Sequence, residues 1–126
     1  MARAIFSTED APAPVAAYSQ GARIGNVVAV AGQVGMTREG ETASGIEAQT
    51  RQALDNIAAI LAAAGAGLDD ILQVRVFLTD KENFGPMNAA YSEYFDAETA
   101  PVRTTVYVGL PRDLLVEIDV LAVLDG

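Results

Sequence analysis

The sequence predicts an α+β fold, in which two helices cover one face of a single mixed sheet. Segments rich in β-forming residues alternate with two amphipathic segments, in the order strands, helix, strand, helix and two strands. The chain has 126 residues, of which 51% are hydrophobic and 20% charged, a composition typical of a folded protein. Because no linker, repeat or low-complexity tract divides the chain, we expect one domain over residues 1–126.

The first strands are predicted close to the N-terminus, after an extended Ala/Pro-rich lead-in over Asp10–Pro14. Strands at Ala22–Ile24 and Val27–Ala31 flank Gly25-Asn26, a dipeptide typical of a tight hairpin turn. A further short strand is predicted at Gln33–Met36.

The first helix is predicted over Ser44–Ala64. Ser44 and Glu47 have the spacing of a capping box, and Gly65 stands where a left-handed helix cap is expected. One apolar stripe recurs at steps of three and four, formed by Ile46, Thr50, Ala53, Leu54, Ile57, Leu61 and Ala64.

A strand over Ile71–Thr79 and a second helix follow. Thr79 and Glu82 offer another capping box, and the helix is expected to end near Asp96. Its apolar face carries Phe84, Met87, Tyr91 and Phe95. The two strand–helix–strand connections predict parallel strand pairs within the sheet.

Two alternating strands, Val102–Val108 and Leu114–Leu124, are expected to form a closing hairpin around Gly109–Asp113. A hairpin symmetric about Pro111 sets Arg103 opposite Asp119 and Thr105 opposite Glu117. One face then carries Arg103, Thr105, Tyr107, Glu117 and Asp119, and the Val/Ile face meets the helices.

Arg103 has two interpretations in this arrangement. It forms a cross-strand ion pair on a solvated face, or its planar guanidinium binds a carboxylate ligand through two parallel hydrogen bonds. Leu121 and Val123 fall on the same face. A sheet face that mixes apolar and polar side chains suggests burial against another subunit.

Three further polar positions interrupt the apolar pattern. Asn88 lies at the edge of the second helix's apolar stripe, where its amide either satisfies buried backbone or lines a pocket. Tyr18-Ser19-Gln20-Gly21 is an ordinary polar loop or part of a site. Gly32-Gln33 interrupts a Val-rich strand, which indicates a bulge or a close backbone approach.

Composition excludes several kinds of chemistry. The chain has no Cys, His or Trp, which excludes disulfides, thiol nucleophiles, imidazole bases and Cys or His metal sites. No loop has the alternating acidic spacing of a Ca or Mg site, so no metal is expected. The net charge of −9 and singly scattered arginines disfavour nucleic acid as a partner.

No membrane association is expected either. The N-terminus turns acidic too early for a secretory signal, and the longest uncharged stretch, Asn56–Leu68, is shorter than the roughly 20 residues that a spanning helix needs. We therefore expect a cytoplasmic protein.

Several ordered motifs together resemble the Rid (reactive intermediate deaminase, or YjgF) family over nearly the whole chain. The resemblance rests on Ala17-Tyr18-Ser19-Gln20-Gly21, Ala31-Gly32-Gln33, Gln52-Ala53-Leu54-Asp55-Asn56-Ile57, Met87-Asn88-Ala89-Ala90-Tyr91, Pro101-Val102-Arg103-Thr104-Thr105-Val106, Leu110-Pro111 and Val116-Glu117-Ile118-Asp119. Two positions depart from the family pattern: Ala17 replaces a Pro, and Thr105 stands where many members have Cys.

The resemblance implies a chorismate-mutase-like fold, a homotrimer and active sites in clefts between subunits. It also implies hydrolysis of reactive 2-imino acids, such as 2-iminobutanoate and 2-iminopropanoate, to 2-oxo acids and ammonia without a cofactor. By position, Arg103 would bind the substrate carboxylate, and Glu117 would hold and orient the attacking water or stabilise the iminium. Further residues implied to contact substrate are Tyr18, Ser19, Gly32, Asn88 and the backbone of Thr105.

Other functions remain open on the sequence. The same scaffold suits a hydrolase of another small imine, enamine or carbamate-like metabolite, or a metabolite-binding regulatory protein without turnover. Ribonuclease activity, also attached to the family, is disfavoured by the acidic composition.

Overall fold

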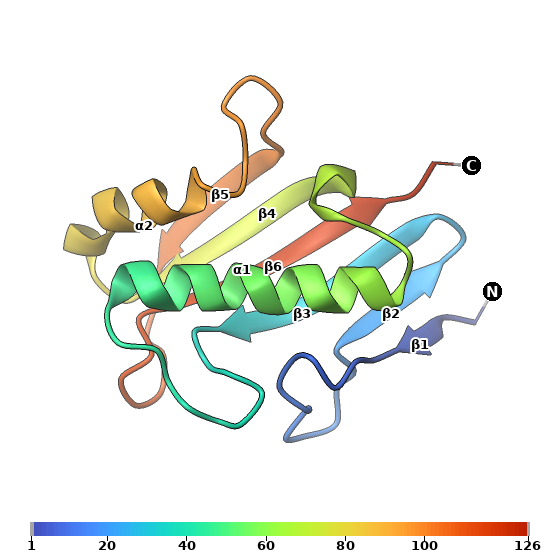
Figure 1. Cartoon of the computed structure of the whole chain (residues 1–126), viewed down its shortest axis with the longest axis horizontal. Helices are drawn as coiled ribbons and strands as arrows, with labels where there is room; N and C mark the ends of the chain where they lie inside the picture. The colour runs from blue at the N-terminus through green and yellow to red at the C-terminus, as the bar shows by residue number, and fades with distance from the viewer. Residues whose placement is uncertain (1, 126) are drawn as a thin grey trace.

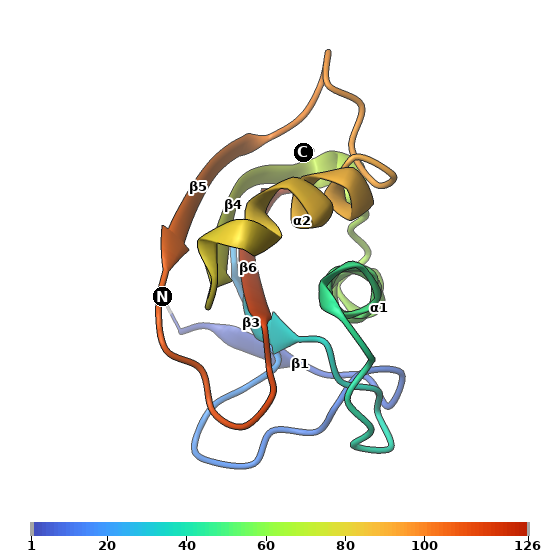
Figure 2. The same cartoon turned by 90° about the vertical axis from the view of Figure 1, so that its left-hand side faces the viewer.

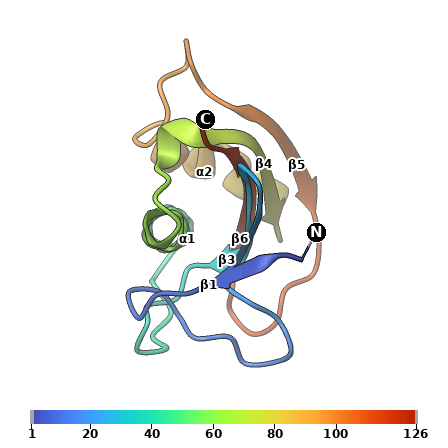
Figure 3. The same cartoon turned by 90° about the vertical axis from the view of Figure 1, so that its right-hand side faces the viewer.

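A computed structural model describes residues 2–125 as a curved sheet with both helices on one face and the other face bare (Figures 1, 2 and 3). The strands are β1 (Ala4–Phe6), β2 (Gly21–Ile24), β3 (Val27–Val34), β4 (Ile71–Leu78), β5 (Val102–Tyr107) and β6 (Val116–Val123). The helices are α1 (Ile46–Ala63) and α2 (Phe84–Tyr91), with short 3-10 turns at Leu68–Asp70 and Lys81–Asn83. The predicted class of fold is confirmed.

The six strands follow the spatial order β1-β2-β3-β6-β4-β5. β4 and β5 pair in parallel, joined by a crossover through α2, and every other neighbouring pair is antiparallel. β6 lies between β3 and β4, so those two strands run in the same direction without touching. The chain end therefore completes the middle of the sheet.

The predicted closing hairpin is wrong, because β4 separates β5 from β6. Arg103 stands beside Val74 of β4, and Asp119 stands beside Arg75 of the same strand. The α2 crossover lays β5 parallel to β4 on its outer edge, and the loop before β6 then passes back across β4. Alternation along a strand predicts two faces, but it does not identify the neighbouring strand.

Of the two C-terminal strands, β6 has the predicted faces and β5 does not. On β6, Val116, Ile118, Val120 and Ala122 face the helices and are buried, as expected. On β5 the faces are reversed: Val102 and Val106 are exposed on the bare side, whereas Arg103 and Thr105 share the helix side with the buried Val74 and Val76. Arg103 and Glu117 thus lie on opposite faces of the sheet.

The helices begin later than their capping boxes predict. α1 starts at Ile46 after Gly45, whose φ of 87° gives a cap with no side-chain hydrogen bond, so the Ser44–Glu47 box does not form. Asp80, not Thr79, caps the turn before α2, accepting a hydrogen bond from the Glu82 N–H at 2.9 Å. The α-helix itself ends at Tyr91, and turns carry the chain on to Phe95.

The glycine predictions hold. Gly25 (φ 59°) forms the β2–β3 turn and Gly65 (φ 76°) follows the end of α1 in the left-handed region. The predicted short strand at Gln33–Met36 is not a separate strand: Gln33 and Val34 end β3 after a register shift between Val30 and Gln33, and Met36 forms only an isolated bridge with Thr42. That shift is the bulge that Gly32 predicted.

Among residues 2–125, no helix is long and apolar enough to cross a membrane.

Candidate functional site

The side chain of Arg103 extends from the edge strand β5 toward α2. Its Cζ lies 4.7 Å from the ring centroid of Tyr91 and 5.8 Å from that of Phe84, both on α2. A guanidinium over aromatic faces is stabilised electrostatically and keeps the N–H groups of its planar fork free to bind other ligands. We call Arg103 with Tyr91, Phe84, Asn88 and Thr105 the Arg103 cluster.

The Arg103 cluster contains two buried polar atoms without a partner. Among residues 2–125, neither Asn88 Oδ1 nor the Tyr91 hydroxyl has a hydrogen bond of good geometry. Burial raises the pKa of Tyr91, and the positive charge of Arg103 partly opposes this rise. Such unsatisfied atoms are uncommon in folded proteins, and a bound water, ion or ligand is one way in which they are completed.

Glu117 occupies the bare face at the other side of the sheet. Its carboxylate lies directly over Gly32: a Cβ added there would stand 2.6 Å from Glu117 Oε2. Burial raises the pKa of Glu117, and the neighbouring carboxylate of Asp119 adds to the rise. The bulge in β3 and the absence of a side chain at Gly32 together make room for a half-buried carboxylate.

Tyr18 and Ser19 lie on the loop that leads into β2. The buried Gln20 fixes this loop, accepting a hydrogen bond from the Thr8 N–H at 2.7 Å and donating to the Pro12 carbonyl at 2.8 Å. The Tyr18 ring is 50% exposed, so it can contact a ligand without rearrangement.

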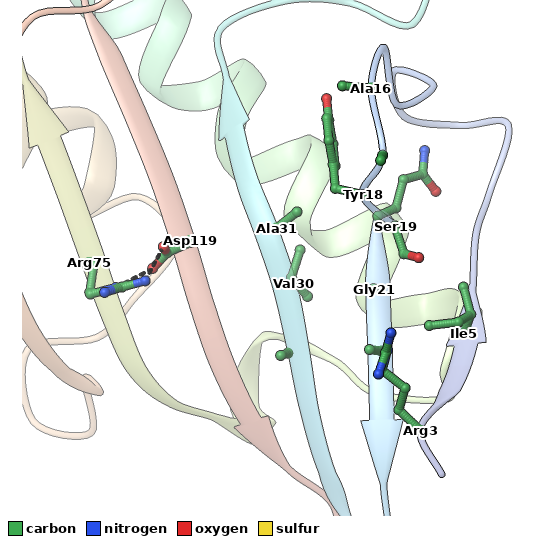
Figure 4. A pocket seen from close by; sticks show the side chains of 14 residues that line it. Arg3, Ile5, Ala16, Tyr18, Ser19, Gly21, Val30, Ala31, Arg75 and Asp119 are labelled. Carbon is green, nitrogen blue, oxygen red and sulfur yellow. Dashed lines mark hydrogen bonds and ion pairs between the residues drawn. The ribbon is translucent and has the colours of Figure 1, made fainter.

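The loop borders two cavities. Tyr18 and Ser19 line one of about 600 Å³ on the bare face, which reaches across β3 to Arg75 and Asp119 (Figure 4). Tyr18 and Gly32 line the other, of about 350 Å³. We call Glu117 with Gly32, Tyr18 and Ser19 the Glu117 cluster.

The structure therefore divides the predicted site residues into two sets. Arg103, Thr105 and Asn88 come together on the helix side of β5. Glu117 and Gly32 come together on the bare face, next to the loop of Tyr18 and Ser19. The prediction that Arg103, Thr105 and Tyr107 share a face with Glu117 and Asp119 is wrong, because β5 pairs with β4 and not with β6.

Sequence reasoning missed three participants. Tyr91 and Phe84 are predicted only as members of an apolar helix face. Their spacing of seven residues, or two helical turns, nevertheless places both rings on the same face of α2 as Asn88. Arg75 is predicted only as a scattered cation, yet it pairs with Asp119 through two hydrogen bonds of 2.7 and 2.9 Å. The sequence signal for this pair was the alternation of β4, which sets Arg75 between buried Val74 and Val76.

Acidic side chains do not gather into a metal-binding group: within residues 2–125, no cluster of three could hold an ion.

Comparison with known proteins now gives the class. Residues 8–124 match the family model described as Endoribonuclease L-PSP. The chain belongs to this family, which is the Rid (YjgF) family.

Two solved structures and one relative illustrate the similarity. The 2-iminobutanoate/2-iminopropanoate deaminase of Escherichia coli K12 is 40% identical over 122 residues, covering 94% of this chain and 95% of the relative. The TdcF protein of E. coli, solved with bound serine, is 36% identical with a TM-score of 0.91, covering 97% and 99% of the two chains. A Rid-family protein of unknown function from Yersinia pestis is 36% identical with a TM-score of 0.92, covering 98% and 100%.

Proposed function

We propose that the protein hydrolyses reactive 2-imino acids to 2-oxo acids and ammonia, without a cofactor. The observation that carries the proposal is the Arg103 cluster: a guanidinium held over two aromatic rings, with two polar atoms nearby that have no hydrogen-bond partner within residues 2–125. Such a fork binds a small carboxylate through two parallel hydrogen bonds. The relative named as a deaminase and the neighbour solved with serine act on or bind small molecules of this kind.

The reaction needs only positioning and proton transfer. The substrate iminium is already electrophilic, so a water placed beside its C2 forms the new C–O bond while the C=N π electrons move to nitrogen. Glu117 accepts the proton that the water loses. Protonated Glu117 then gives its proton to the nitrogen of the resulting carbinolamine. The C–N bond breaks to release ammonia, and the hydroxyl oxygen forms the C=O of the 2-oxo acid as its proton passes to Glu117.

We further propose that each complete site forms between copies of the chain, in a homotrimer. Arg103 and Glu117 lie on opposite faces of one sheet, so one chain does not present both to one small substrate. The bare face exposes apolar side chains that a second copy would cover: Ile5, Ile24, Val27, Val102 and Val106. A solution mass of about three times 13.2 kDa is expected.

The decisive experiment couples the protein to an enzyme that releases imino acids, such as a threonine dehydratase or an amino-acid oxidase. The protein should accelerate formation of the 2-oxo acid from the imine. Arg103→Ala should lower this acceleration about 100-fold or more, because a bidentate charge-assisted pair is lost. Arg51→Ala is the matched control, since Arg51 pairs with Glu93 on the outer side of the helix layer. An Arg103→Ala protein that folds and works equally well would refute the assignment.

The name of the family model raises a second candidate, cleavage of RNA. The net charge of −9 opposes binding to a phosphate backbone. A titration of RNA binding against salt separates the two: weak binding at low salt favours the deaminase. Strong binding that falls steeply with salt would instead favour the nuclease. A protein that binds 2-oxo acids without accelerating imine hydrolysis would be a regulatory member of the family.

A further inference from the structure

An ion pair lies beside Glu117 on the bare face of the sheet. Arg75 on β4 donates from Nε to Asp119 Oδ1 at 2.9 Å and from Nη2 to Oδ2 at 2.7 Å (Figure 4). The Arg75 guanidinium also lies over the ring of Phe77, with its Cζ 5.8 Å from the centroid. Two parallel hydrogen bonds and an aromatic contact fix this guanidinium on one carboxylate.

The strand geometry sets a second carboxylate next to that pair. Glu117 and Asp119 are two residues apart on β6 and share its bare face, about 7 Å apart along the strand. The register places Phe77 beside Glu117 and Arg75 beside Asp119. Of the two carboxylates, only Asp119 forms an ion pair within residues 2–125.

We propose that Arg75 and Asp119 are positioning residues that set the protonation of Glu117, by placing a compensated negative charge next to it. This inference rests on the proposed function only in giving Glu117 the role of proton acceptor. Arg75 and Asp119 do not contact the reacting atoms in this scheme. They act through the field at the Glu117 carboxylate.

The neighbours of Glu117 support this assignment. From β6 it faces Asp119, from β4 Phe77 and, beyond Asp119, Arg75, and from β3 it covers Gly32. Within residues 2–125, Arg75 and Asp119 are thus the charged groups of the adjoining strands on this face near Glu117. Burial raises the pKa of Glu117, and the Asp119 carboxylate raises it further. Because the Arg75 guanidinium is bound to Asp119, its positive charge should act on Glu117 in the opposite sense. The charge of Arg103 from a second copy would affect the pKa of Glu117 equally in all variants.

Removing Asp119 and removing Arg75 should shift the pH at which Glu117 loses its proton in opposite directions. Asp119→Asn leaves the Arg75 charge uncompensated and should lower the pH at which Glu117 loses its proton by about 0.5 to 1 pH unit. Arg75→Met leaves the Asp119 charge uncompensated and should raise that pH by a similar amount. The double variant removes both charges and should return close to the original value.

Two readouts test these shifts. The first is the acid limb of kcat/KM for imine hydrolysis against pH. The second is a ¹³C NMR titration of the glutamate carboxyl groups, in which the Glu117 signal is assigned by its loss in Glu117→Gln. Arg51→Met is the matched control, because Arg51 holds Glu93 with the same bidentate geometry, at 3.0 and 2.8 Å, away from this face. It should move neither readout.

The outcomes separate the two hypotheses. If the NMR titration shows the opposite shifts and no variant hydrolyses imines, the charge-setting role stands and the proposed function fails. If the wild-type protein hydrolyses imines but both single variants titrate like it, or both shift in the same direction, the role of the pair is refuted. Arg75→Lys, which keeps the charge, should behave like the wild type in both measurements.

Discussion

Replacing Gly32 by Ala should displace the Glu117 carboxylate with little effect on the stability of the fold. The new Cβ would stand 2.6 Å from Glu117 Oε2 and 2.9 Å from its Cδ, so the carboxylate must move by about 1 Å to regain van der Waals separation. The φ angle of Gly32 is outside the left-handed region, so the alanine backbone itself is unstrained. The displaced atoms are the end of a half-exposed, flexible side chain, and the expected loss of stability is below about 1 kcal/mol.

The effect on activity should be much larger than the effect on stability. A displacement of about 1 Å in a catalytic group costs about 100-fold in rate, so kcat for imine hydrolysis should fall by about this factor. The melting temperature should fall by no more than about 4 °C. Imine hydrolysis by coupled assay and thermal unfolding by circular dichroism measure the two quantities on the same sample.

Gly35→Ala, at the residue that follows β3, is the matched control. Its Cβ would meet the Gln49 side chain and stand 2.5 Å from the Cα of Gln49, in the backbone of α1. Because the clash involves the helix backbone and not only the end of a flexible side chain, this variant should lose about 1–3 kcal/mol of stability. Equal losses of stability in the two variants, or full activity in Gly32→Ala, would refute the placement of Glu117 over Gly32.

Substitutions at three other positions follow from the contacts. Tyr91→Phe keeps the ring beneath Arg103 and should leave KM within a few fold, whereas Tyr91→Leu removes it and should raise KM about 10-fold, measured by steady-state kinetics. Glu117→Gln should abolish turnover. Because the folded-state pKa of Glu117 is raised, its ionisation destabilises the fold as pH rises through that value, so Glu117→Gln should unfold at an equal or higher temperature than the wild type at pH 7 and show no such gain at pH 3. The buried Gln49 amide bonds the Ala43 and Asp113 carbonyls and the Leu115 N–H, so Gln49→Ala should cost about 3 kcal/mol or more in urea unfolding, and a cost below 1 kcal/mol would contradict that role.

Local chemistry made much of the fold predictable. The apolar stripe of α1 and the alternation of β6 each identify one buried face, because a helix and a strand repeat their side-chain directions with fixed periods. Gly25 and Gly65 mark positions where the chain needs positive φ, which few other residues adopt. These features depend on neighbours in sequence, and they were predicted correctly.

Long-range pairing was not predictable in the same way. The pattern of β5 is equally compatible with pairing to β6 or to β4, and only the crossover through α2 decides between them. Because β5 pairs with β4, the Arg103 side chain lies over Tyr91 of α2 and not beside Asp119, and Asp119 forms its ion pair with Arg75. Ser44 failed as a cap for a different reason, since Gly45 turns the chain before the helix begins.

The separation of Arg103 from Glu117 by the thickness of the sheet has a genetic consequence. If each site takes Arg103 from one copy and Glu117 from another, two inactive chains should complement each other when they assemble together. Equal amounts of Arg103→Ala and Glu117→Gln chains, unfolded and refolded as a mixture, should recover about a quarter of the wild-type sites, because that fraction of interfaces joins an intact Arg103 to an intact Glu117. The same chains refolded separately and then mixed without exchange should stay inactive. Alleles of this gene that inactivate opposite halves of the site would then be expected to rescue one another in one cell.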